Sequence, residues 1–250
     1  MMSRLFKYFV LSLGLVATSA FADNVRIGSV TTLTTPAGAM GRDMVDAANI
    51  ALDHIGHKMG GKAVEFIVED DGFKPEIGKQ KTDKLVKQDD VHFVTGFIWS
   101  HVLLASRKSA LDGGKFLISA NAGPSPLAGK LCHKNFFSSS WQNDQNPMAT
   151  GEVLNKKGVK KLYIMSPNYA AGKNMVAGVE RTFKGEIVGK DMTKWVRTCN
   201  LIFPQNSPKP KHRARTLSLS FTRVRPGRRS SSSMIRQDYV ERFRFTRSLR

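Results

Sequence analysis

Small polar residues and glycines, rather than catalytic clusters, stand at the loops of this chain. Ser100 directly follows an apolar run and opens a helical pattern, so its hydroxyl and the free amides there could hold a carboxylate. An ordinary N-cap serine explains the same spacing equally well. Ala122 and Gly123 follow the next apolar run, where small residues let a ligand approach the backbone closely, although a plain turn before Pro124 is the alternative.

Three further side chains are suited to lining a pocket. Tyr169 lies after a strand pattern and is a polar-tipped aromatic that could close a pocket, or else a half-buried loop residue. Met40 and Trp99 could line an apolar surface, but ordinary packing explains either of them. Together with Ser100, Ala122 and Gly123, these residues form the set of candidate ligand contacts.

Signatures of catalysis and of metal binding are weak. The sequence contains no GxGxxG, no GxxxxGK[ST] and no GxSxG segment. His54 and His57 could share a metal, but no third ligand is evident and an exposed helix face explains them better. The acidic run 69–71 could bind a cation, yet negative charge before a helix start at Pro75 is the commoner arrangement. We therefore expect a binding protein without a cofactor, not an enzyme.

Alternating strand and helix patterns position these loops. Strands are predicted at 25–31, 63–68, 91–95, 115–119, 135–140, 161–165 and from 185, and helices at 42–57, 75–88, 100–111, 147–157 and 171–183. Single helices between strands indicate βαβ units, and so an α/β fold with doubly wound parallel sheets. Such sheets bind ligands at the carboxyl ends of their strands, which here means the loops 32–41, 97–101, 120–126 and 166–172.

The first 22 residues have the pattern of an export signal. Arg4 and Lys7 precede an apolar run at 8–17, and 20–22 reads Ala-Phe-Ala, the small-x-small pattern of a signal-peptidase site. The apolar run is too short to span a bilayer comfortably. We expect this segment to be cleaved and the mature chain to be exported.

The formal net charge of +19 is concentrated in one segment. Residues 196–250 contain 14 Lys and Arg against two Asp and Glu, so the rest of the chain is only mildly basic. Nucleic acid or an anionic surface is therefore suggested by this segment alone. Cys132 and Cys199 are too few for a disulfide framework.

An ordered set of segments resembles a known family. The segments are VRIGSVTTLTTPAGAMGRDMVDAANIALDHI, VEFIVEDDGFKPEIGKQKTDKLV, VHFVTGFIWSHVLLA, KFLISANAGPSP, NFFSSSWQNDQNPMATGEVL and KLYIMSPNYAAGKNMVAGV. In this order they resemble the leucine/isoleucine/valine-type (type I periplasmic) substrate-binding proteins of ABC importers, over about residues 24–194. The resemblance implies two lobes joined by a hinge, at 23–142 and 143–195, that close on a small solute. It also implies a periplasmic location and a membrane permease as partner.

The resemblance assigns roles to the candidate residues. Ser100 and the backbone around Ala122 and Gly123 would hold the carboxylate and amino groups of the ligand. Met40 would contact the ligand side chain, and Tyr169 would cap it from the second lobe. Trp99 before the serine and the loop ANAGPSP depart from the amino-acid binders. Aromatic carboxylates and short amides therefore stand beside branched-chain amino acids as candidate ligands.

The composition changes after residue 195. Residues 1–195 contain 20 Lys and 5 Arg, whereas 196–250 contain 2 Lys and 12 Arg. We interpret 196–250 as a basic, low-complexity, disordered tail that is out of frame, because LSLSFTRVRPGRRS can be back-translated so that another frame reads LFVFYPGAAGTS. The second lobe is then incomplete, and we expect exposed apolar faces and an unstable or poorly binding chain.

Two other functions remain open. The tail could bind nucleic acid or an anionic surface, in which case removing 196–250 would abolish a steep salt dependence of binding. The doubly wound fold could instead carry an enzyme, since fold does not settle function. We expect no nucleic-acid partner, because the chain carries an export signal.

Overall fold

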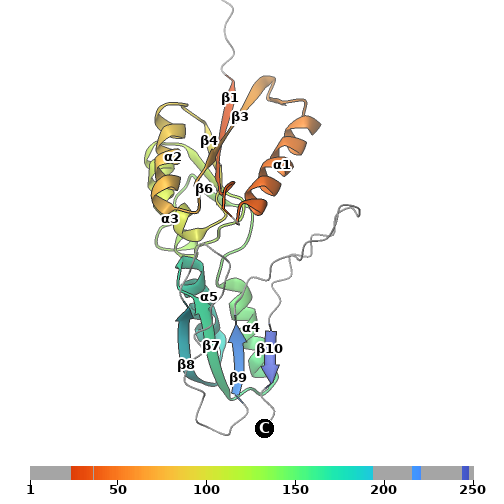
Figure 1. The fold of residues 1–250 in the computed structure, drawn as a ribbon, viewed down its shortest axis with the longest axis vertical. Coiled ribbons are helices and arrows are strands. Elements are labelled where there is room, and N and C mark those ends of the chain that lie inside the picture. Colours follow the sequence, from red (N-terminus) through yellow and green to blue (C-terminus); the bar gives the residue numbers. More distant parts are fainter. Residues whose placement is uncertain (1–23, 36, 194–215, 221–243, 248–250) are drawn as a thin grey trace, which may run out of the picture.

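The structure, a computed structural model, describes residues 24–35, 37–193, 216–220 and 244–247. Two sheets lie one beyond the other along the long axis of the molecule, each with its own helices (Figure 1). This arrangement agrees with the predicted α/β class and with two lobes. No helix among these residues has the length and apolar character needed to cross a bilayer.

The first lobe is built on a six-stranded sheet of order β2-β3-β1-β4-β5-β6. Its strands are β1 (Val25–Thr31), β2 (Lys58–Met59), β3 (Lys62–Asp70), β4 (Phe93–Gly96), β5 (Phe116–Ser119) and β6 (Phe136–Ser138). Its helices are α1 (Gly38–His54), α2 (Pro75–Lys87), α3 (Ser100–Asp112) and the short 3-10 helix η1 (Ser125–Ala128). All strand pairs are parallel except β2 with β3, so the carboxyl ends of β1, β3, β4 and β5 share one edge.

The second lobe has a four-stranded sheet of order β10-β9-β7-β8. Its strands are β7 (Lys161–Pro167), β8 (Glu186–Thr193), β9 (Thr216–Ser220) and β10 (Arg244–Arg247), and its helices are α4 (Gln145–Lys156) and α5 (Ala170–Thr182). β8 and β9 run parallel to β7 on either side of it. The chain enters this lobe between β6 and α4.

Each lobe has its own apolar core. Residues from three strands of the first sheet, Val30, Val94 and Leu117, are fully buried in one cluster with Leu85 of α2 and Leu103 of α3. A smaller cluster in the second lobe contains Leu154, Leu162, Ile164, Val176, Val179 and Phe183. Each fully buried aliphatic side chain contributes about 1.5–3 kcal/mol, and these clusters fix the strand ends that carry the candidate residues.

The opposite face of the first sheet exposes aromatic rings. Phe93 and Phe116 are stacked with ring centroids 5.6 Å apart, and Phe137 lies 6.3 Å beyond Phe116. Phe116 is 41% exposed and Phe137 is 51% exposed. We call Phe93, Phe116 and Phe137 the aromatic strip. The expectation of exposed apolar faces is met here.

The connection between α1 and β3 differs from its prediction. The sequence predicts a helix over 42–57 and then a strand at 63–68, but α1 ends at His54, and Gly60 and Gly61 form the turn of a hairpin between β2 and β3. Their φ angles of +56° and +79° are the left-handed values that a two-residue hairpin loop requires. A two-residue strand has no periodicity by which the sequence could reveal it.

Two short parts of the tail also differ from their prediction. β9 pairs with β7 and β10 pairs with β9, so these segments have regular structure where none was expected. The sequence TLSLS in β9 alternates apolar and polar residues, the period of a strand. The expected signal peptide, the proposed frame change near 195 and most of the tail lie outside the described residues.

Candidate functional site

The loop after β4 turns the chain toward the start of α3. Phe97 is fully buried and has a φ of +62°, an uncommon left-handed conformation for a side chain of this size. Its backbone N–H donates to the carbonyl of Val30, 2.7 Å away, which holds the turn against β1. Trp99 then becomes the N-cap of α3 and Ser100 its first residue.

Trp99 joins three loops at the strand ends. It is 5% exposed, and its ring packs edge-on against Phe73 with centroids 4.6 Å apart. The indole N–H donates to Thr32 Oγ1 at 2.9 Å, and the Thr32 hydroxyl donates to Asp71 Oδ1 at 2.5 Å. Burial raises the pKa of Asp71 above its usual value, although this hydrogen bond opposes the rise.

The acidic residues 69–71 form hydrogen bonds and ion pairs with neighbouring loops and α2, rather than a metal centre. Asp70 accepts hydrogen bonds from the Leu33 and Gly72 backbone N–H groups, both at 2.9 Å, and from the Thr34 hydroxyl at 2.6 Å. Burial works against ionisation, yet these bonds hold the pKa of Asp70 below its usual value. Glu69 pairs with lysines of α2. Within the described ranges, no three His, Cys, Asp or Glu residues gather as metal ligands would.

Ser100 is engaged by a residue that the sequence did not indicate. Ser100 is 3% exposed, and its Oγ accepts a hydrogen bond of 2.9 Å from the Asn143 side-chain amide. Asn143 is 4% exposed and lies between β6 and α4. Because Oγ acts as the acceptor, the hydroxyl hydrogen of Ser100 can still be donated to another group.

Ala122 and Gly123 use their backbone groups within the protein. The Ala122 N–H donates to the Phe97 carbonyl at 2.9 Å, and the Ala122 carbonyl accepts from Ser119 Oγ at 2.5 Å. The Gly123 carbonyl accepts from the Asn143 N–H at 2.8 Å. A Cβ at position 123 would lie 1.8 Å from the Trp141 carbonyl, so only glycine fits there. Their role as ligand contacts stays a prediction.

Tyr169 reaches from the second lobe to the first. It is the N-cap of α5, and it packs against the buried cluster of the first lobe, as Met40 of α1 does. Its ring meets His101 edge-on, with centroids 5.8 Å apart, and His101 meets Phe73 in the same way at 5.4 Å. These ring contacts connect Tyr169 to Trp99 through His101 and Phe73, whereas Met40 is placed only against the same apolar cluster.

His101 is a second residue that the sequence reading missed. Burial lowers its pKa, against a weaker effect of Glu76, so the imidazole favours its neutral form. Its Nδ1 is buried and has no hydrogen-bond partner among the described residues. The one available signal was its place beside Ser100 at a helix start. A neutral ring between Phe73 and Tyr169 provides an apolar aromatic surface next to a hydroxyl donor.

Two helix starts approach each other at this junction. α3 begins at Ser100 in the first lobe and α5 begins after Tyr169 in the second, and Figure 1 shows α5 below α3 where the lobes meet. The free amides of helix N-termini favour anions. A hydroxyl, aromatic rings and helix N-termini can hold a small carboxylate with an apolar body. Among the residues that the structure describes, no general base is hydrogen-bonded to the Ser100 hydroxyl.

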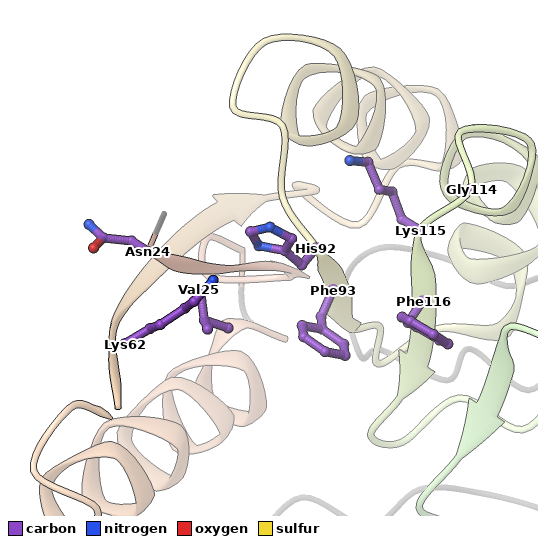
Figure 2. Close-up of a pocket in the computed structure, with 8 residues that line it drawn as sticks. All are labelled: Asn24, Val25, Lys62, His92, Phe93, Gly114, Lys115 and Phe116. Carbon is purple, nitrogen blue, oxygen red and sulfur yellow. The ribbon is translucent and has the colours of Figure 1, made fainter. Parts of the chain in front are cut away.

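A depression at the far edge of the first sheet is a weaker candidate. It has a volume of about 390 Å³, and it is lined by Asn24, Val25, Lys62, His92, Phe93, Gly114, Lys115 and Phe116 (Figure 2). These residues stand at the amino ends of the strands, whereas parallel sheets bind ligands at the carboxyl ends. Lys115 Nζ already donates to Asp90, 2.6 Å away. The junction near Ser100 is therefore the better candidate site.

Known proteins resemble this chain over the same region. The family model described as periplasmic binding protein matches residues 24–196. The Leu/Ile/Val-binding protein BraC3 of Rhizobium johnstonii is 28% identical over 175 residues, covering 67% of this chain and 47% of the relative. The chain thus spans about half the length of the curated relatives it matches.

Solved structures give the same result. A solute-binding protein of an ABC transporter from R. palustris, in complex with benzoate, is 28% identical with a TM-score of 0.65, and the match covers 69% of this chain and 49% of that one. A branched-chain amino acid transporter substrate-binding protein from Streptococcus pneumoniae, in complex with isoleucine, has the same fold with a TM-score of 0.60 at 24% identity, over 70% of this chain and 50% of that one. The matched fold is that of the two lobes described above. The chain belongs to the periplasmic binding protein family.

Proposed function

We propose that this protein is the solute-binding component of an ABC importer and holds a small carboxylate where its two lobes meet. It would act in the periplasm and deliver the ligand to a membrane permease. Family membership supports the general role. The observation that carries the ligand class is Ser100, whose hydroxyl hydrogen remains available at a helix start, next to His101, whose ring meets Tyr169 of the other lobe.

Aromatic carboxylates fit this junction best. His101, Phe73 and Tyr169 meet edge to face, and that geometry can extend to one more ring. The similar R. palustris protein was solved with benzoate. Branched-chain aliphatic amino acids are the next class, because Met40 offers a soft apolar contact.

We expect binding to be weak in the chain as given. The match to the family ends at residue 196, and the relatives are about twice as long. Among the described residues, the second lobe contributes Tyr169 and α5 to this junction. Ligand-observed NMR suits this case, because saturation transfer detects weak complexes.

The experiment adds benzoate, isoleucine or benzyl alcohol to the full chain and records saturation transfer to each probe. Benzoate should receive the strongest transfer, and benzyl alcohol, which lacks the carboxylate, should receive little. Ser100→Ala should reduce the benzoate signal severalfold. Ser106→Ala, a control at a buried serine on the same helix, should leave it unchanged.

Other outcomes would contradict the proposal. Equal saturation transfer to benzoate in Ser100→Ala and Ser106→Ala would show that Ser100 is not part of the binding site. No transfer to any carboxylate would count against solute binding itself. The probe spectra should also be the same after long incubation, because a transport protein releases its ligand unaltered. New resonances would instead indicate an enzyme.

A further inference from the structure

Asn143 lies where the chain passes from the first lobe to the second. It is 4% exposed, and its backbone N–H is bonded to the Gly123 carbonyl at 2.8 Å. Its side-chain nitrogen donates to Ser100 Oγ at 2.9 Å and to Asn174 Oδ1 at 3.3 Å. One amide group therefore contacts the start of α3 and the side of α5.

Asn174 extends this contact to a third segment. It belongs to α5 of the second lobe, and its Oδ1 also accepts the backbone N–H of Ser125 at 3.1 Å. Ser125 opens η1 in the first lobe. Moving the second lobe away from the first would break the Ser125 bond and strain the bond to Asn143.

The chemistry of the groups sets the direction of the Ser100 hydroxyl. A primary amide has two N–H donors, and Asn143 uses them on Ser100 and Asn174. While Ser100 Oγ accepts, its own hydrogen must point elsewhere and can be donated to an anion. Without the amide, the hydroxyl would be free to rotate toward other acceptors and would lose this orientation.

We propose that Asn143 is a positioning residue that couples the orientation of the Ser100 hydroxyl to the contact between the two lobes. The affinity part of this inference rests on the proposed carboxylate binding. The part about the contact between the lobes does not, because it concerns the protein without ligand. Two experiments separate the parts.

The first experiment is a double-mutant cycle on the full chain, with benzoate as the probe. Asn143→Ala should weaken binding by about tenfold, the effect of one hydrogen bond to a charged group. In the Ser100→Ala background, the same substitution should change affinity by less than about twofold, because no hydroxyl remains to orient. An equal loss in both backgrounds would overturn the positioning role.

The second experiment measures the distance between the lobes without ligand. Spin labels are attached to the first and second lobes through Lys108→Cys and Lys160→Cys, both at exposed positions. Cys132→Ser and Cys199→Ser remove the chain's own cysteines beforehand. Asn143→Ala should shift the distance distribution to longer and broader values. An unchanged distribution would overturn the coupling, whether or not benzoate binds.

A matched variant controls for the loss of an amide side chain that makes two hydrogen bonds. Asn155 also uses its amide in two hydrogen bonds, to the Thr182 carbonyl and from the Lys184 N–H, both at 2.8 Å, but within the second lobe. Asn155→Ala should leave the distance distribution and the benzoate affinity unchanged. If Asn143→Ala does not fold, Asn143→Asp keeps the shape without the donors and should give the same lengthening. A failure of benzoate binding with a lengthened distribution would contradict the proposed function but support the coupling.

Discussion

The Thr32 hydroxyl links the loops of the first lobe that carry Trp99 and Asp71. Its hydroxyl accepts from Trp99 Nε1 and donates to Asp71, whose second carboxylate oxygen is buried without a partner in the described part of the chain. Removing this hydroxyl takes one hydrogen bond from the buried indole N–H and one from the buried Asp71 carboxyl, which keeps its bond from the Phe73 N–H. A lost hydrogen bond costs about 0.5–1.5 kcal/mol, and about 1.5–3 kcal/mol where one partner is charged.

Thr32→Val should therefore lower the free energy of unfolding by about 2–4 kcal/mol, measured by chemical denaturation with tryptophan fluorescence. Thr82→Val is the control, because Thr82 is equally buried but its hydroxyl donates to the Gly78 carbonyl one helical turn away, within the same helix. Equal losses for the two variants would show that the loop bridge adds nothing beyond burial.

Glu69 makes the first lobe sensitive to acid. Burial raises its pKa, but hydrogen bonds and charges from Lys81 and Lys84 lower it more, so the net pKa lies below its usual 4.5. A group whose pKa is lower in the folded state stabilises the fold above its unfolded pKa. That stability is lost as the pH falls through the folded value.

Glu69→Gln should reduce the free energy of unfolding by about 1–3 kcal/mol at pH 7. This difference should shrink as the pH falls toward 3, because the wild-type carboxyl takes up its proton as the pH approaches its lowered pKa. Denaturation curves across this range test the sign. Glu65→Gln, at an exposed position of the same strand, should show no such dependence. A constant difference between pH 7 and pH 3 would rule out the ion pairs as its source.

Individual site residues were only partly predictable. Ser100 and Tyr169 could be located because strand ends and helix starts are visible in the periodicity of the sequence. Asn143 and His101 were missed, since their contacts depend on how the second lobe packs on the first. Trp99 was expected either at a pocket wall or in ordinary packing; its indole N–H bonds to Thr32, and its role as a ligand contact stays a prediction.

The strands of the first sheet carry an unusual exposed surface, the aromatic strip. Phe116 and Phe137 are half exposed on neighbouring strands, and a contiguous apolar patch of this kind favours association with other apolar surfaces. The sequence could not reveal the strip directly. The alternation of residues along a strand distinguishes its two faces, but it does not show which face a helix covers.

Phe137→Ser should reduce self-association of the purified chain at high concentration, measured by sedimentation velocity. Its melting temperature should change little, because a half-exposed ring contributes little burial. Val153→Ser provides the control on α4, where Val153 is 43% exposed but outside the strip. Equal effects of the two variants would mean that general hydrophobicity, not the strip, drives association.

The fold as a whole was largely readable from the order of its elements. Strand and helix positions in 25–193 agree with the periodicity to within a few residues at most ends. The larger differences are α1, which begins at Gly38, before the expected residue 42, and the hairpin at Gly60 and Gly61. Gly41 allows that early start, because it lets the first turn of α1 lie against the end of β1. A Cβ at this position would lie 1.9 Å from the Thr32 carbonyl oxygen.

The coding DNA offers a test of the proposed change of frame after residue 195. The family match ends at 196, where the composition shifts from lysine to arginine. We expect another frame downstream of this codon to encode a segment similar to the second half of the relatives. If neither alternative frame resembles them, the basic segment is native, and the pairing of β9 with β7 becomes part of the natural fold.

The position of the bound solute can be measured directly by amide chemical-shift mapping of the ¹⁵N-labelled full chain during titration with benzoate. Binding between the lobes predicts saturable shifts at Ser100, Asn143 and Tyr169. Shifts confined to Val25, Phe93 and Phe116, which line the depression at the opposite edge of the sheet, would contradict it. A spectrum that stays unchanged at every benzoate concentration would contradict it as well.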